Sequence, residues 1–112
     1  MGSYFGTAQS IKEKNMSLST KQKQYLRGLG HHIEPVLKTG KEGLSENMLL
    51  EIHEFLERDE LIKVKIGKGP LHRKEAVEIL KHKLIGEVVQ LLGKNILLFR
   101  QKKEESRIHL PK

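Results

Sequence analysis

Two glycines bracket a Lys-Glu pair in the stretch LKTGKEGLSENM, which covers residues 37–48. Glycine permits positive φ and lets another molecule approach the backbone, so Gly40 and Gly43 fit either a plain turn or a cradle for a phosphate. In a cradle, the backbone N–H groups ahead of a helix would bind the phosphate beside the positive end of the helix dipole. Lys41 would add a point charge at the tip of the loop. Taken alone, these residues leave both interpretations open.

No other group of residues forms a recognisable catalytic or ligand-binding pattern. The six histidines lack metal-binding spacing of the HExxH kind, and the glycine loop lacks the GxxxxGK[ST] run of a nucleotide-binding loop. The chain has no cysteine, which excludes disulfides, thiolate catalysis and sulfur-based zinc sites. The acids between residues 46 and 57 fall on the polar side of an amphipathic helix, where nothing indicates a catalytic cleft. We therefore expect no enzymatic activity, no cofactor and no bound metal.

The elements that would position the loop can be predicted from the periodicity of the apolar residues. Helices are predicted over residues 20–30, 45–58 and 72–84, and a short strand over 35–38 leads into the glycine loop. LIKVKI at 61–66 alternates like a half-buried strand, and EVVQLL and ILLFR predict a closing β-hairpin around GKN. The order α-β-α-β-α-β-β predicts an α+β fold, a two-layer sandwich in which the helices pack on a four-stranded mixed sheet.

The length of the chain predicts a single domain, over residues 16–100. Residues 1–15 differ in composition from the rest of the chain, and Met16 is a plausible natural start, so we expect the first stretch to be an appended or disordered tail. Residues 101–112 form a polar, basic C-terminal tail that we expect to be mobile. The sequence contains no apolar run of the roughly 18 residues that a membrane span requires, so we expect a cytoplasmic protein without a membrane partner. It leaves the oligomeric state open.

The formal net charge of +7 is divided into blocks along the chain. Residues 42–60 hold seven acids and one arginine, whereas the segments on both sides are basic. Lys23, Arg27 and His31 lie at successive i,i+4 steps and predict a basic stripe on the helix that precedes the glycine loop. A basic surface interrupted by one acidic segment suits a polyanion that binds on one side only.

Several short motifs together are specific to a known family. They are STKQKQ from residue 19, Leu29-Gly30-His31-His32, Pro35-Val36, the loop from Gly40 to Leu44, ELIKVK from residue 60, VQLLGKN from residue 89, and Leu98-Phe99-Arg100. This combination resembles the bacterial YhbY family, the single-domain form of the CRM (chloroplast RNA splicing and ribosome maturation) domain. The resemblance covers nearly all of residues 18–112, and it is looser over residues 67–87.

The resemblance implies a fold similar to the C-terminal domain of a bacterial translation initiation factor. It also implies RNA binding through the GxxG loop and the adjacent basic surface, with large-subunit rRNA in pre-ribosomal particles as the partner. The expected RNA-binding residues are Gly40, Lys41, Gly43, Lys21, Lys23, Arg27, Lys38, Lys63 and Lys65. The alternative is a protein-interaction adaptor that docks a basic ribosomal protein on the acidic face of the helix at 45–58.

Overall fold

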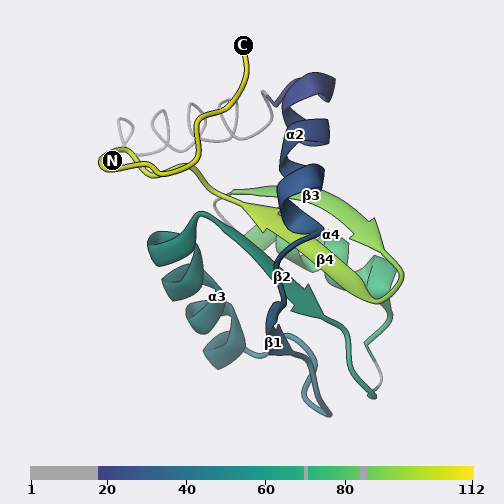
Figure 1. The fold of residues 1–112 in the computed structure, drawn as a ribbon. Coiled ribbons are helices and arrows are strands. Elements are labelled where there is room, and N and C mark those ends of the chain that lie inside the picture. The colour runs from purple at the N-terminus through teal and green to yellow at the C-terminus, as the bar shows by residue number, and fades with distance from the viewer. Residues whose placement is uncertain (1–17, 70, 84–85) are drawn as a thin grey trace, which may run out of the picture.

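The computed structural model describes residues 18–69, 71–83 and 86–112, so the expected tail at residues 1–15 lies outside the described residues. The described elements succeed one another in the expected order (Figure 1). They are α2 (Thr20–Gly30), β1 (Pro35–Lys38), α3 (Glu46–Asp59), β2 (Leu61–Lys65), α4 (Arg73–Lys83), β3 (Glu87–Leu92) and β4 (Asn95–Phe99). Among these described elements, no helix is long and apolar enough to cross a membrane.

The four strands form one mixed sheet, which confirms the expectation of a four-stranded mixed sheet, and their order is β1-β2-β4-β3. β1 runs parallel to β2 with Lys38 opposite Lys65, and the connection between them passes through α3. β4 pairs antiparallel with both β2 and β3, so β1, β2 and β3 all run in the same direction. The connections β1–α3, β2–α4 and β3–β4 therefore leave the sheet at one edge, which we call the loop end.

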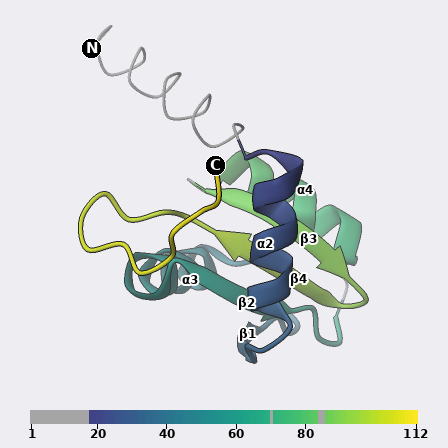
Figure 2. The ribbon, with the colours of Figure 1, turned by 45° about the horizontal axis from the view of Figure 1, so that its top comes forward.

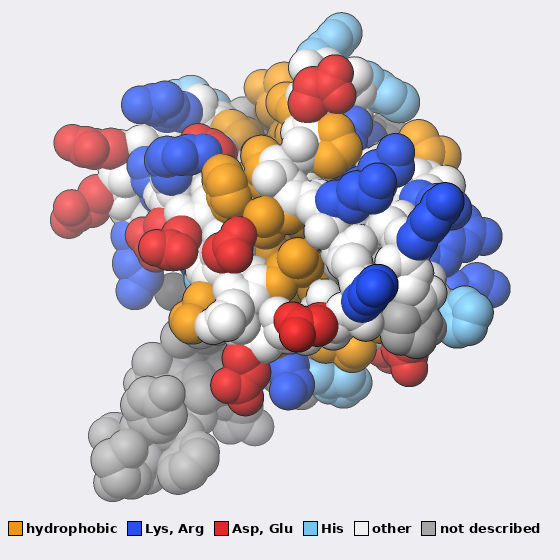
Figure 3. All heavy atoms as spheres, turned by 90° about the horizontal axis from the view of Figure 1, so that it is seen from below, with side chains coloured by type: hydrophobic (Ala, Val, Ile, Leu, Met, Phe, Trp, Pro, Cys, Tyr) orange, Lys and Arg blue, Asp and Glu red, His pale blue; other side chains and the backbone are white. Residues whose placement is uncertain are grey.

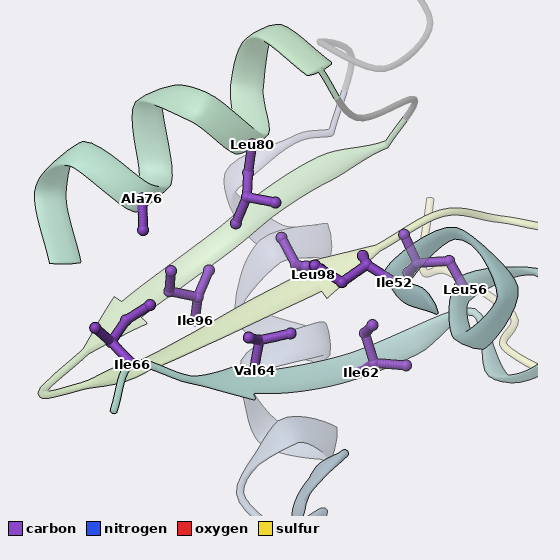
Figure 4. Packing of buried hydrophobic residues seen from close by; sticks show 9 residues of the cluster. All are labelled: Ile52, Leu56, Ile62, Val64, Ile66, Ala76, Leu80, Ile96 and Leu98. Atoms are coloured by element: carbon purple, nitrogen blue, oxygen red, sulfur yellow. The ribbon is translucent and has the colours of Figure 1, made fainter. Parts of the chain in front are cut away.

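Helices cover both faces of the sheet, which corrects the expectation of two layers. On one face, α3 and α4 pack over side chains of β2 and β4 (Figure 4). On the other face, Leu26 of α2 packs with Leu97 and Phe99, and Figure 2 shows α2 lying across the front of the sheet with α4 behind it. The cause is β4, in which Ile96 and Leu98 face one layer while Leu97 and Phe99 face the other. A central strand that is apolar on both sides needs cover on both sides, so the domain has three layers.

Serine caps fix where α2 and α3 begin. Ser19 Oγ accepts from Gln22 N at 3.1 Å while Gln22 Oε1 accepts from Ser19 N at 3.0 Å, forming a capping box. Ser45 Oγ accepts from Met48 N at 3.2 Å. A cap of this kind stabilises a helix by about 1 kcal/mol. The Ser45 cap therefore holds the start of α3 directly behind the glycine loop at residues 40–43.

The C-terminal segment, residues 101–112, packs against the domain, so the expectation of a mobile tail was wrong. The carboxylate of Glu60, a residue only 1% exposed, accepts hydrogen bonds from Lys102 N at 2.8 Å, Arg107 N at 2.7 Å and Ser106 Oγ at 2.6 Å. Burial pushes the pKa of Glu60 upward, but these hydrogen bonds outweigh it and hold the pKa below its ordinary value. Ile108 then packs on the α2 side of the sheet.

Candidate nucleic-acid interface

The first glycine loop, at residues 40–43, is a closed turn at the loop end of the sheet. Gly43 N donates to Gly40 O at 3.0 Å, which places Lys41 and Glu42 at the exposed centre of the turn. Gly43 has a φ of +63°, a left-handed conformation that favours glycine, and it is buried against Leu71. The turn itself therefore accounts for the glycine at residue 43.

Gly40 is different, because nothing in the fold requires a glycine at that position. Its φ lies outside the left-handed region, and no atom lies within 4 Å of the place where a Cβ would stand. The residue is exposed on the surface. A side chain would therefore fit at residue 40, and what the glycine provides is an open path for another molecule to reach the backbone.

A second glycine loop, at residues 66–69, lies directly against the first. Gly67 N donates to Thr39 Oγ1 at 3.0 Å, and Thr39 N donates to Lys65 O at 2.9 Å. A Cβ on Gly69 would stand 2.6 Å from Gly40 O, and a Cβ on Gly67 would collide with Thr39 O. The two loops therefore touch backbone to backbone, and side chains at 67 or 69 would force them apart.

Basic side chains surround these two loops. We call them the loop-end cluster: all are exposed, and they are Lys38, Lys41, Lys65, Lys68, Arg73, Lys74 and Lys94. Figure 3 shows Lys and Arg side chains gathered on the right of this face, whereas Asp and Glu side chains are more frequent on the left, the side on which α3 lies. The charge blocks of the sequence are therefore also separated in space. Such a surface attracts a polyanion to the loop end of the sheet.

The structure brings together only part of the expected RNA-binding set. Residues at the loop end are Lys38, Gly40, Lys41, Gly43 and Lys65. Lys21 and Lys23 lie in the first turns of α2, which begins at the opposite end of the molecule (Figure 1). Lys23 is near Glu87 at the start of β3: burial raises the pKa of Glu87, and the charge of Lys23 partly opposes that rise.

Arg27 and Lys63 are half-buried on the α2 face of the sheet. Arg27 Nε is buried, and within the described residues it has no hydrogen-bond partner. Lys63 stands between Ile62 and Val64, which both point into the α3/α4 core, so its own side chain leaves β2 on the α2 side. Neither residue belongs to the exposed cluster at the loop end.

Four bases of the loop-end cluster lie outside the expected RNA-binding set: Lys94 was missed, whereas Lys68, Arg73 and Lys74 were only speculative candidates, because they lie in the segment of looser family resemblance. A signal for Lys68 was present, because GKEG and GKG each come after a strand and each precede a helix. Strands joined by a helical crossover run parallel, so the loops at their carboxyl ends meet at one edge of the sheet. Lys94 lies in the β3–β4 turn, and its place at this edge depends on the sheet order, which the sequence pattern does not specify.

The histidines contribute no site of their own. Within the described residues, no group of three or more His, Asp or Glu side chains could hold a metal ion. His53 Nδ1 lies 3.1 Å from Arg100 Nη1, and burial, together with the smaller effect of the charge of Arg100, lowers the pKa of His53. This histidine therefore links α3 to the residue immediately after β4. The chemistry that the described surface offers is binding of anions by exposed bases and accessible backbone.

Comparison with protein families and with curated proteins gives consistent matches. The model of the CRS1 / YhbY (CRM) domain matches residues 18–100. A Haemophilus influenzae protein named RNA-binding protein is 40% identical over 100 residues, covering 86% of this chain and 97% of its own length. The Bacillus subtilis protein named Probable RNA-binding protein YqeI is 39% identical over 95 residues, covering 84% of this chain and 99% of its own length.

A solved structure shares the same architecture. The solution structure of a hypothetical protein from Staphylococcus aureus, provisionally assigned to RNA binding, superposes with a TM-score of 0.71. Its sequence is 42% identical, and the match covers 84% of this chain and 99% of that one. Both the sequence and the fold of this chain thus have counterparts in bacteria.

Proposed function

Because the chain belongs to the CRS1 / YhbY (CRM) domain family, we propose that it is an RNA-binding protein that uses the loop end of the sheet. The observation that carries this proposal is the meeting of two glycine loops inside a cluster of exposed bases. The RNA-binding names of the relatives agree with it.

Binding at this surface would depend on the phosphate backbone. Gly40 leaves its backbone open to a phosphate, and Lys38, Lys41 and Lys68 supply positive charge on both sides of it. Each Lys or Arg that contacts a phosphate releases counterions, so affinity falls steeply with salt concentration. Sequence-independent contacts of this kind read the course of the backbone and the shape of the RNA.

The aromatic side chains argue against recognition by base stacking. Among the described residues, Phe55 packs against the core and Phe99 is buried. Tyr25 is 41% exposed, but it lies on α2, away from the loop end. Proteins that bind single strands by stacking present several exposed aromatics on one face. Structured RNA with closely spaced phosphates is therefore the better substrate for this surface.

The finer proposal is that the RNA is large-subunit rRNA in pre-ribosomal particles, which the protein assists to assemble without catalysis of its own. This rests on the family resemblance together with the RNA-binding surface. Ultraviolet cross-linking in cells, with sequencing of the attached RNA, tests it. We expect large-subunit rRNA to dominate, with unprocessed precursor ends enriched. Reads spread over messenger or transfer RNA would contradict the ribosomal proposal and leave RNA binding itself intact.

A second function is favoured by the outer face of α3. Leu50 is 61% exposed there, and five exposed acids lie on the same helix: Glu46, Glu51, Glu54, Glu57 and Asp59. An exposed leucine among acids suits a basic protein partner, such as a ribosomal protein. Purified RNA separates the two functions, because an adaptor of this kind would bind RNA only in the presence of its protein partner.

A further inference from the structure

A depression of about 520 Å³ opens beside the second glycine loop. Its walls come from the residue after β2, the second glycine loop, the start of α4 and the β3–β4 turn, and its basic lining residues are Lys68, His72, Arg73, Lys74 and Lys94. The lining includes three lysines, one arginine and one histidine, and it includes no acid. The depression is therefore a basic concavity on the surface.

Contacts between separate parts of the chain hold the walls in place. Arg73 Nη1 donates to Gly93 O at 3.1 Å, which ties the start of α4 to the β3–β4 turn. Ile66 N donates to Lys94 O at 2.7 Å, which ties that turn to the end of β2. Arg73 therefore uses part of its hydrogen-bonding capacity to position the β3–β4 turn. Within the described residues, the ion pairs use other bases, so Lys68, Lys74 and Lys94 keep their charges available.

The depression continues directly from the first glycine loop. Gly69, in its wall, would place a Cβ 2.6 Å from Gly40 O, and Leu71, also in its wall, packs against Gly43. Lys68 lies between Gly67 and Gly69 in the second glycine loop, and it lines the depression as well. A phosphate bound at Gly40 would therefore have the basic wall of the depression as its next neighbour on the protein surface.

Resting on the function proposed above, we propose that this depression is a second phosphate-backbone site of the RNA-binding surface. One RNA backbone runs from the Gly40 turn across Lys68 and into the depression, where Lys74 and Lys94 contact its phosphates. The RNA thus lies along the α4 side of the loop end, and the basic residues at the start of α2 stay outside its path.

Directed cleavage of the RNA maps this path. The chain has no cysteine, so Lys41→Cys, Lys94→Cys and Lys21→Cys each create one attachment point for an iron chelate that generates hydroxyl radicals. With a large-subunit rRNA transcript at low salt, we expect positions 41 and 94 to cleave neighbouring nucleotides of one segment, and position 21 to leave that segment intact. If the chelates at positions 41 and 21 cleave that segment and the chelate at position 94 does not, the proposal is overturned.

Charge removal gives an independent measurement. The double variant Lys74→Gln/Lys94→Gln should reduce the slope of log affinity against log salt by about 1.4 to 1.8, because each phosphate contact contributes about 0.7 to 0.9. If the variant and the unaltered protein bind equally at about 1 M salt, this change in slope makes the affinity of the variant about 25- to 60-fold lower near 0.1 M salt. The matched control, Lys21→Gln/Lys103→Gln, removes the same charge from exposed residues outside the loop-end cluster.

The outcomes separate the two proposals. If the unaltered chain binds the transcript and both double variants lose equal affinity, only general electrostatics is at work and the second site is overturned. If the unaltered chain binds no RNA at low salt, the proposed function fails and the second site fails with it. Circular dichroism of each variant checks that the fold is retained, and the cleavage map at position 94 does not depend on the glutamine variants.

Discussion

Gly40 and Gly43 should respond in opposite ways to replacement by alanine. A Cβ at residue 40 meets no atom within 4 Å and φ is not left-handed, so Gly40→Ala should leave stability unchanged or raise it by about 0.4–1 kcal/mol. At residue 43, φ is +63°, and holding alanine in that conformation costs about 1–2 kcal/mol. Urea denaturation measures both free energies of unfolding.

Among the variants that fold, the Gly40→Ala protein should lose more RNA affinity than the Gly43→Ala protein. A methyl group at residue 40 stands where a phosphate would approach the backbone, and losing a hydrogen bond to a charged group costs about 1.5–3 kcal/mol. Gly40→Ala should therefore weaken RNA binding about ten- to hundredfold at this energy. Gly28→Ala is the matched control, because residue 28 also has open space around it but lies in α2, away from the loop end.

Fluorescence anisotropy with a labelled large-subunit rRNA fragment would measure these affinities. Wild-type affinity for the Gly40→Ala protein, with its stability intact, would refute the claim that a phosphate reaches the backbone at residue 40. An equal loss in the Gly28→Ala protein would show that the effect is not local. Because stability and affinity are expected to move independently, misfolding cannot imitate the predicted result.

Three further predictions concern Glu42, Glu60 and Gly67. Glu42→Gln should strengthen RNA binding about fivefold in the same anisotropy assay, since like charges about 4 Å apart in water repel by about 1 kcal/mol; weaker binding would show that Glu42 makes a favourable contact. The pKa of Glu60 is lower in the fold than its ordinary value of 4.5, so its contribution is present above that pH and is lost as pH falls through the lowered pKa. The protection of the Lys102 and Arg107 amides against hydrogen exchange, relative to their intrinsic rates, should fall in that acidic range, and already at neutral pH in Glu60→Gln; unchanged protection would exclude the carboxylate as the anchor. Gly67→Ala should destabilise the domain by about 1–3 kcal/mol in urea, because its Cβ would collide with Thr39 O; wild-type stability would show that the two loops can separate freely.

Periodicity and capping residues were sufficient to predict the elements. The helix at 20–30 was predicted with its observed bounds, since Ser19 supplies the cap and Pro35 prevents continuation. The mixed sheet was predictable from one helical crossover and one hairpin. The layer count was not, because the decisive residues are Leu97 and Phe99, which make β4 apolar on both faces. A continuous apolar run such as ILLF predicts this arrangement if it is taken as a central strand.

The residues of the first glycine loop were predictable from the sequence, whereas the bases around it were predicted less well. The turn at Gly40 and Gly43 is a local pattern, and Lys41 lies within it. Lys94 joins the cluster only because β4 inserts between β2 and β3, a long-range pairing that a short window of sequence does not contain. The same limit explains Lys21 and Lys23, which are close to the loop in sequence but lie at the far end of α2 in space. Glu60 anchors the C-terminal segment, but in the sequence it is only the last acid of the acidic block at residues 42–60, so its role as an anchor was not predicted.

The central claim is that exposed bases at the loop end bind the phosphate backbone of RNA. It is tested most directly by titrating structured large-subunit rRNA with the unaltered protein at several salt concentrations. If four to six bases of the loop-end cluster contact phosphates, the slope of log affinity against log salt should lie between about −3 and −5. Absence of binding at low salt, or an affinity that does not change with salt, would contradict the claim.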